Sequence, residues 1–182
     1  LGYTKSEIVD EFYESEQYTF DPKTEKWKTK FNPENYKAKN FSEEVVDAKN
    51  GKVVINLGDK INYLNAKKLS NEGLKDILVS KESLYGKFLH SDVKINDEEN
   101  GILKIGTELN ETIIDQILEA KIHTLEISVT NSINKGGYLL TTIFNDKNNT
   151  KDDAITEIYK MLRPGEPPTI EIATQIFNSL FF

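Results

Sequence analysis

The sequence predicts an α+β fold in which small, tandem β-rich modules lie between helical segments. Apolar residues alternate in several short runs, follow a helical period near both ends of the chain, and recur as a 48-residue repeat in the middle. The chain has 182 residues, 37% of them hydrophobic, which is enough to build a sizeable core. It therefore reads as a folded protein rather than a disordered one.

The N-terminal part predicts a helix followed by a hairpin. In residues 6–13 the apolar side chains are spaced for one face of a short helix. Residues 17–20 and 26–31 flank the turn-forming residues 21–25, and the second arm alternates lysine with Trp27 and other strand-forming residues. We expect two paired strands with one solvated face.

A second hairpin is expected around Asn50-Gly51, the strongest two-residue turn signal in the chain, between residues 44–48 and 52–57. Beyond it lies the repeat, because aligning Gly58 with Gly106 also superimposes the apolar positions that follow. The matched pairs are Ile55 with Leu103, Ile61 with Leu109, Leu69 with Ile117, Leu74 with Ile122, Ile77 with Leu125 and Val79 with Ile127.

Each copy of the repeat, about residues 52–95 and 101–145, predicts a strand, a glycine turn, a short helix and a second strand. In the second copy Asn110 is placed to cap a helix over residues 111–120, ahead of a strand over 124–129. Residues 86–89 and 137–140 are expected to form a closing strand in each copy. The alternative explanation is a chance alignment of apolar residues.

The C-terminal part predicts two helices, over residues 152–162 and 170–180, with Thr169 capping the second. Between them the segment 163–168 holds three of the five prolines. The chain ends on Phe181-Phe182, which would leave an apolar patch exposed unless it tucks back or the chain is cut from a longer one. We expect the latter.

Polar segments at 96–101 and 145–151 are candidate boundaries. The expected division is residues 1–40 with a helix and hairpin, 41–145 with both copies of the repeat, and 146–182 with the last two helices.

Composition excludes several classes of protein. Lysine and arginine number 23 against 30 aspartate and glutamate, a net charge of −7, which opposes free-standing nucleic-acid binding. No cysteine is available for disulfides or for cysteine-based metal sites. No apolar run approaches the ~20 residues of a membrane span. Arg163 is the only arginine and so the only candidate for a bidentate phosphate or guanine contact.

The residues that could carry chemistry form no catalytic, metal or cofactor motif. His90 and His123 have no second ligand at metal-binding spacing, and we interpret them as polar residues of strand faces. The acidic turn at 96–101 lacks the spacing of a calcium loop, and Gly58 and Gly106 belong to no phosphate-binding motif. No catalytic residue is therefore expected, and autonomous enzymatic activity is not predicted.

Two basic features remain, each with two interpretations. Trp27, among Lys26, Lys28 and Lys30, could stack on a base, but a lysine-protected edge strand is the favoured interpretation. Arg163 could be held at a helix end to contact a ligand, or it could satisfy the last carbonyls of the helix before it.

Residues 157–169, EIYKMLRPGEPPT, followed by the terminal LFF, closely resemble a signature of the beta subunit of bacterial DNA-directed RNA polymerase. The opening segment 3–13 is similar to that family's entry into the same region, and residues 137–139 are similar to its stretch before the final helices. The resemblance spans the whole chain, strongly at the C-terminus and diffusely in the middle.

The resemblance implies a fragment of the beta lobe in which residues 41–145 are a lineage-specific insertion between the lobe-flanking ends. In that family the catalytic magnesium belongs to the beta-prime subunit, so the fragment would hold no cofactor and be inactive alone. Arg163 is similar to a family position that faces the non-template DNA strand. The implied partners are the beta-prime, alpha and sigma subunits, DNA in the downstream cleft and regulators docked on the insertion, in the cytoplasm at the nucleoid.

Two functional hypotheses follow. The leading one is a non-catalytic part of the nucleotidyltransferase, forming the lobe wall of the downstream DNA cleft and carrying a docking surface. The alternative is a free-standing β-module that binds a protein or a carbohydrate. It would need a pocket of aromatic and polar groups between the two copies of the repeat.

Overall fold

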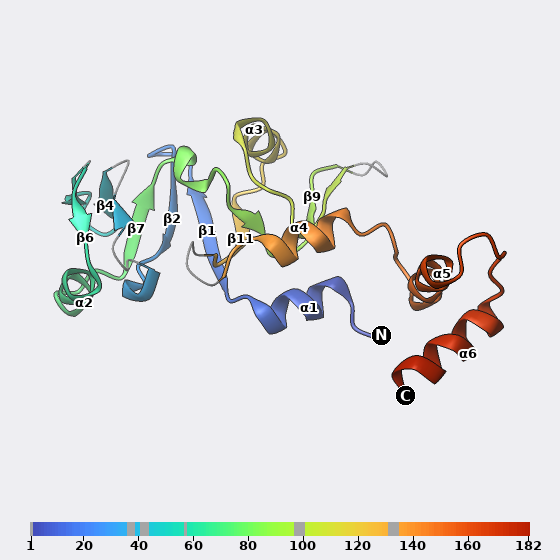
Figure 1. The fold of residues 1–182 in the computed structure, drawn as a ribbon. Coiled ribbons are helices and arrows are strands. Elements are labelled where there is room, and N and C mark those ends of the chain that lie inside the picture. The colour runs from blue at the N-terminus through green and yellow to red at the C-terminus, as the bar shows by residue number, and fades with distance from the viewer. Residues whose placement is uncertain (1, 36–38, 41–43, 57, 97–100, 131–134) are drawn as a thin grey trace. The chain divides into compact units, whose positions relative to one another are not determined.

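The computed structural model describes residues 2–35, 39–40, 44–56, 58–96, 101–130 and 135–182 (Figure 1). The chain divides into two compact units, a larger one over Lys5–Phe144 and a smaller one that comprises Asn145–Phe182 with the N-terminal residues up to Thr4. None of the described helices combines the length and the apolar character that a membrane crossing requires.

The larger unit contains most of the secondary structure. Its helices, with the single turns η1 and η2, are α1 (Lys5–Phe12), η1 (Pro33–Asn35), α2 (Tyr63–Asn71), η2 (Lys81–Leu84), α3 (Glu111–Glu119) and α4 (Tyr138–Asn145), whose last residue lies at the boundary. Its strands are β1 (Ser15–Asp21), β2 (Lys26–Lys30), β3 (Lys39–Asn40), β4 (Val45–Asp47), β5 (Val53–Ile55), β6 (Lys60–Ile61), β7 (Asp76–Val79), β8 (Phe88–Leu89), β9 (Val93–Lys94), β10 (Ile102–Leu103) and β11 (Thr124–Ser128).

Seven of the described strands form one antiparallel sheet in the order β5-β4-β7-β2-β1-β11-β8. The predicted α+β class is therefore confirmed. Both expected hairpins are present, since β1 pairs with β2 and β4 pairs with β5 around Asn50-Gly51. The β1–β2 hairpin lies in the middle of the sheet, where each of its strands has a second neighbour.

The central position of β2 corrects the interpretation of Trp27. The strand is paired on both sides: Lys28 lies opposite Thr19 of β1, and Trp27 lies opposite Val79 of β7. Strand β2 is therefore not an edge strand. The indole is fully buried and cannot stack on a nucleic-acid base. The lysines instead occupy the other face of the strand, where Lys28 pairs with Asp76 at 3.2 Å.

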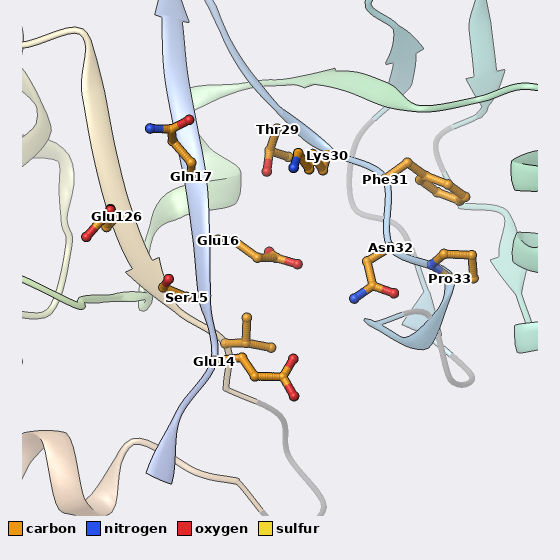
Figure 2. Close-up of a pocket in the computed structure, with 11 residues that line it drawn as sticks. Glu14, Ser15, Glu16, Gln17, Thr29, Lys30, Phe31, Asn32, Pro33 and Glu126 are labelled. Carbon is orange, nitrogen blue, oxygen red and sulfur yellow. The ribbon is translucent and has the colours of Figure 1, made fainter. Parts of the chain in front are cut away.

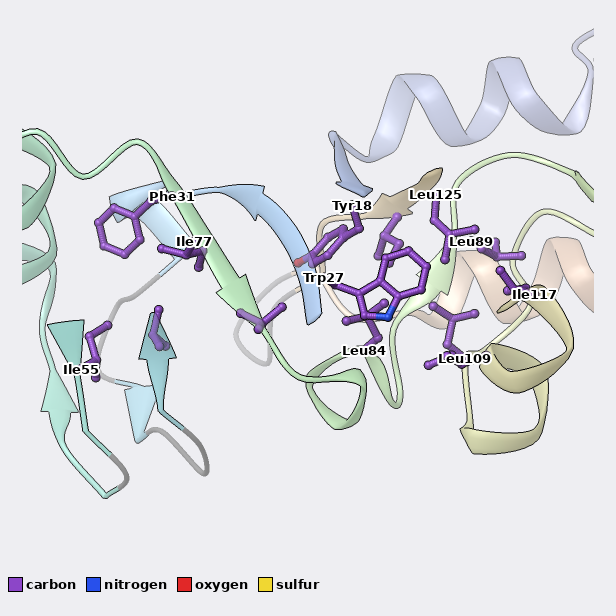
Figure 3. Close-up of a cluster of buried hydrophobic side chains, with 14 of the residues drawn as sticks. Tyr18, Trp27, Phe31, Ile55, Ile77, Leu84, Leu89, Leu109, Ile117 and Leu125 are labelled. Carbon is purple, nitrogen blue, oxygen red and sulfur yellow. The ribbon is translucent and has the colours of Figure 1, made fainter. Parts of the chain in front are cut away.

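One large apolar cluster holds the larger unit together. Figure 3 shows Trp27 among Leu84, Leu109 and Leu125, which come from four different segments of the chain. Burying one such side chain contributes about 1.5–3 kcal/mol, so these long-range contacts, rather than local propensity, determine how the strands are ordered.

A helix and a strand recur at the expected 48-residue spacing. Asn62 and Asn110 cap α2 and α3 in the same way, each accepting a hydrogen bond from the backbone amide three residues later. The strands that follow, β7 and β11, flank the β1–β2 hairpin on its two sides. Both copies thus contribute to one sheet, and their origin as a repeat stays a prediction.

The expected closing strand of the second copy is wrong. In the first copy Phe88–Leu89 is strand β8, but the corresponding part of the second copy belongs to helix α4. Leu140 and Ile143, one helical turn apart, are buried against Val9 and Tyr13 of the N-terminal segment. The contacting residues are far apart in the sequence. Their packing favours a helix, whose apolar residues recur every three to four positions, over a strand, whose apolar residues alternate.

The expected boundary between residues 40 and 41 lies inside the larger unit. Strands β1 and β2, from the segment 1–40, hydrogen-bond to β7 and β11, from the segment 41–145. The sheet is incomplete without both segments, so the structure does not divide there. The second expected boundary, between 145 and 146, lies within one residue of the division that the structure makes. Most of the acidic turn at 96–101 lies outside the described residues.

The smaller unit is a helical hairpin of α5 (Lys151–Leu162) and α6 (Ile170–Phe181), as predicted. Thr150 and Asp153 form a capping box on α5, and Thr169 caps α6. The two helices pack around four buried side chains, which are Ile155, Tyr159, Ala173 and Phe177.

Candidate functional site

The segment between α5 and α6 is a tight turn built by Pro164 and Gly165. Arg163 ends α5, and its backbone amide donates a hydrogen bond of 2.8 Å to the Tyr159 carbonyl. The Glu166 amide donates back to the Arg163 carbonyl at 3.3 Å, and Gly165 has a φ of +91°. Proline followed by a glycine of positive φ is the sequence of a type II turn, so Glu166 is brought back beside the helix end.

Glu166 accepts hydrogen bonds from two side chains at the same carboxylate oxygen. The Tyr159 hydroxyl lies 2.9 Å and the Arg163 Nη1 lies 3.3 Å from Oε2. These two hydrogen bonds hold the pKa of Glu166 below its ordinary value, and the Tyr159 hydroxyl has the larger effect. The same hydrogen bond to Glu166, with desolvation by burial, raises the pKa of Tyr159.

Both interpretations of Arg163 place it at a helix end, and it lies there half exposed, with 53% of its side chain accessible. Its guanidinium pairs with Glu166, and the backbone amide is the group that bonds a helix carbonyl. A contact with DNA stays a prediction. The sequence analysis missed the roles of Tyr159 and Glu166, although the Pro-Gly pair and the three-residue spacing of Arg163 and Glu166 were available signals.

A second polar network lies in the larger unit and was also missed. His90 Nδ1 is 2.9 Å from the Ser128 hydroxyl, and His90 Nε2 is 2.9 Å from Asp10 Oδ1. Although the residue types are those of a hydrolase triad, Ser128 is only 2% exposed and no substrate can reach its hydroxyl. The network therefore joins helix α1 to the sheet. No spacing in the sequence signals it, because Asp10 is far from His90 along the chain.

A shallow pocket of about 570 Å³ opens beside β1 and β2 in the larger unit (Figure 2). Three carboxylates line it, from Glu14, Glu16 and Glu126, and the Glu16 carboxylate accepts a hydrogen bond from the Asn35 side chain. Thr29 also lines it, with a buried hydroxyl that has no hydrogen-bond partner among the described residues. No lining residue comes from the first copy of the repeat. The pocket is therefore not the site between the copies that a free-standing binding module would need.

Among the residues that the structure describes, no three histidine, aspartate or glutamate side chains are grouped so that they could hold a metal ion.

No family model matches the chain. Over all 182 residues, however, it is 37% identical to the DNA-directed RNA polymerase subunit beta of Rhizobium leguminosarum, and this match covers 13% of that relative. It is 36% identical, with the same coverage, to the subunits of the same name from Rickettsia conorii and Rickettsia felis. The match includes residues 41–145, so that segment is shared with these relatives. The chain thus spans about 13% of the length of these relatives and is similar, from end to end, to a segment of the DNA-directed RNA polymerase beta subunit.

Proposed function

We propose that this chain is a non-catalytic segment of an RNA polymerase beta subunit and acts in DNA-templated transcription as the lobe wall of the downstream DNA cleft. The observation that carries this proposal is the match to beta subunits over the whole chain at 35–37% identity, which extends from the helical hairpin through the sheet.

Within that role, Arg163 contacts the non-template strand. Three features support the contact: Arg163 is the only arginine in an acidic chain, its side chain is half exposed, and the Pro164-Gly165 turn fixes its position at the end of α5. A guanidinium held in this way loses less conformational entropy when it binds a phosphate or a base edge.

Nucleotide addition belongs, in this proposal, to the assembled polymerase. The magnesium ion is held by the beta-prime subunit, and the chain supplies neither a metal ligand nor a catalytic residue. Isolated from the enzyme, the chain has no activity.

The proposed partners are the beta-prime, alpha and sigma subunits, in the cytoplasm at the nucleoid. We further propose that residues 41–145, which carry the 48-residue repeat, offer a docking surface to transcription regulators. Leu64 and Tyr138 are exposed apolar side chains on this segment and are accessible to a partner. The free-standing binding module is the weaker candidate because the described pocket lies outside the junction of the two copies.

A chimeric polymerase tests the proposal. The matching segment of the Rhizobium beta subunit is replaced by this chain, and assembly with the other subunits and transcription from a promoter are measured. We expect both to be retained. A chimeric subunit that folds but fails to assemble would contradict the proposed role.

The DNA contact has its own test in the same chimera. Arg163→Ala should shorten the lifetime of the promoter complex by roughly two- to fivefold, the effect of one partly exposed charge contact. Lys160→Ala, one turn earlier on α5, is the matched control and should change the lifetime little. An unchanged lifetime with Arg163→Ala would rule out the contact.

A further inference from the structure

The turn at the end of α5 places the carboxylate of Glu166 beside Arg163, the residue proposed to contact DNA. We propose that Glu166 is a positioning residue for Arg163: its carboxylate, anchored by Tyr159, holds the guanidinium and offsets its charge, so that a DNA phosphate must compete with Glu166 for Arg163. This inference rests on the DNA contact proposed above.

The anchor is rigid because Tyr159 belongs to the core of the helical hairpin. Its side chain is 3% exposed and packs in the same cluster as Ala173 and Phe177 of α6. Its hydroxyl reaches Glu166 Oε2 at 2.9 Å, while the turn constrains the Glu166 backbone from the other side. The position of the carboxylate is thus fixed by the Tyr159 hydroxyl and by the backbone of the turn, independently of the Arg163 side chain.

Arg163 is in an ion pair with Glu166. Its Nη1 lies 3.3 Å from the oxygen that Tyr159 holds, and both charged side chains remain about half exposed, at 53% and 56%. The Glu166 carboxylate is ionised at neutral pH, because its pKa lies below the ordinary value of 4.5. An approaching phosphate therefore meets a cation and an anion together, and binding is weaker than a lone guanidinium would allow.

The hairpin offers a matched control for this arrangement. Glu157 and Lys160 form an ion pair on α5 whose three-residue spacing and exposure are similar to those of the Arg163–Glu166 pair. Glu157→Gln and Glu166→Gln change the net charge of the chain by the same amount. Only Glu166→Gln removes the anion beside Arg163, and the amide oxygen of glutamine can still accept the hydrogen bond from Tyr159.

The experiment measures the lifetime of promoter complexes at several salt concentrations in the chimeric polymerase. Glu166→Gln should lengthen the lifetime roughly two- to fivefold at low salt, because the competing charge is gone. It should also steepen the salt dependence, by less than the roughly 0.7–0.9 in logarithmic slope that one complete phosphate contact contributes, because Arg163 already makes part of this contact in the wild type. Glu157→Gln should match the wild type, and Glu166→Gln combined with Arg163→Ala should behave as Arg163→Ala alone.

The possible outcomes separate this inference from the function on which it rests. If Arg163→Ala shortens the lifetime but Glu166→Gln leaves lifetime and salt dependence unchanged, the role of Glu166 is overturned and the DNA contact stands. If Glu157→Gln lengthens the lifetime equally, the effect is one of net charge, and the inference is also overturned. If Arg163→Ala has no effect, both fail. A purely structural role of Glu166 would alter the thermal unfolding of the chain without changing the salt dependence.

Discussion

The imidazole of His90 lies 2.9 Å from the hydroxyl of Ser128, and both residues are buried where β8 pairs with β11. Through its other nitrogen, the same ring bonds Asp10 of α1. One side chain therefore connects a helix from the start of the chain to two strands from the middle.

Replacing His90 tests how much this connection contributes. His90→Phe should lower the free energy of unfolding by about 2–3 kcal/mol, because it leaves the buried Ser128 hydroxyl unpaired and forces a larger ring into the core. The measurement is urea denaturation of the whole chain. His123→Phe is the control, since His123 is exposed and stacks on Phe20, and it should change stability by less than about 0.5 kcal/mol. Equal effects at both positions would argue against the network.

The two glycines that match between the copies of the repeat should respond differently to the same change. Gly58 and Gly106 both have positive φ values, +84° and +81°, so alanine at either should cost about 1–2 kcal/mol of backbone strain. At Gly106 an added Cβ would also lie 2.5 Å from the Leu140 carbonyl oxygen, whereas nothing lies within 4 Å at Gly58. Gly106→Ala should therefore be clearly the more destabilising in thermal unfolding. Equal losses would show that α4 can shift away without cost.

Trp27 is the only tryptophan and so reports on the core of the larger unit. Its full burial predicts blue-shifted fluorescence and protection from acrylamide quenching in the native chain. Trp27→Ala should cost about 3–5 kcal/mol, the range for a large buried ring. Lys28→Ala, the next residue on the solvated face, should cost little. Emission typical of a solvated indole would contradict the central position of β2.

The Tyr159–Glu166 hydrogen bond predicts a pH window for the stability of the helical hairpin. The folded-state pKa of Glu166 lies below its ordinary value of 4.5. Its contribution to the free energy of unfolding is therefore present above pH 4.5 and is lost as the pH falls through the lowered pKa. Because the pKa of Tyr159 is raised above 10.0, the hydroxyl's contribution is present below pH 10.0 and is lost as the pH rises through the raised pKa.

Tyr159→Phe tests this window. The difference in melting temperature between the wild type and Tyr159→Phe should be constant between pH 4.5 and 10.0 and should narrow outside that range. Lys160→Ala is the control, because it removes a neighbouring ion pair of α5 while keeping the Tyr159 hydroxyl. A difference that changes steadily across the neutral range would show that other groups control it.

Local signals in the sequence predicted the elements that local interactions stabilise. Asn110, Thr169 and the Asn50-Gly51 turn each act on their near neighbours in the chain, so the α3 cap, the α6 cap and the second hairpin could be predicted from spacing alone. The family resemblance depended on the same kind of information, a contiguous motif around Arg163, and the comparison with beta subunits confirmed it.

Three features instead depended on contacts between distant segments, which spacing does not encode. Residues 137–140 suit a strand or a helix, and burial of Leu140 against Val9 selects the helix. The lysines of β2 suit an edge or a central strand, and pairing with β7 decides between them. His90 acquires its partners only when α1 and β11 meet around it.

The sequence by itself therefore determined the helix caps, the hairpin turns and the resemblance to RNA polymerase beta subunits, because these follow from neighbouring residues and a short motif. The tertiary structure alone decided the order of the strands, the inclusion of β1 and β2 in the same sheet as β7 and β11, and the grouping of Tyr159, Arg163 and Glu166. The physical reason is that apolar burial favours any arrangement that excludes water, and only the packed chain shows which distant segments bring buried polar side chains such as His90 and Ser128 together.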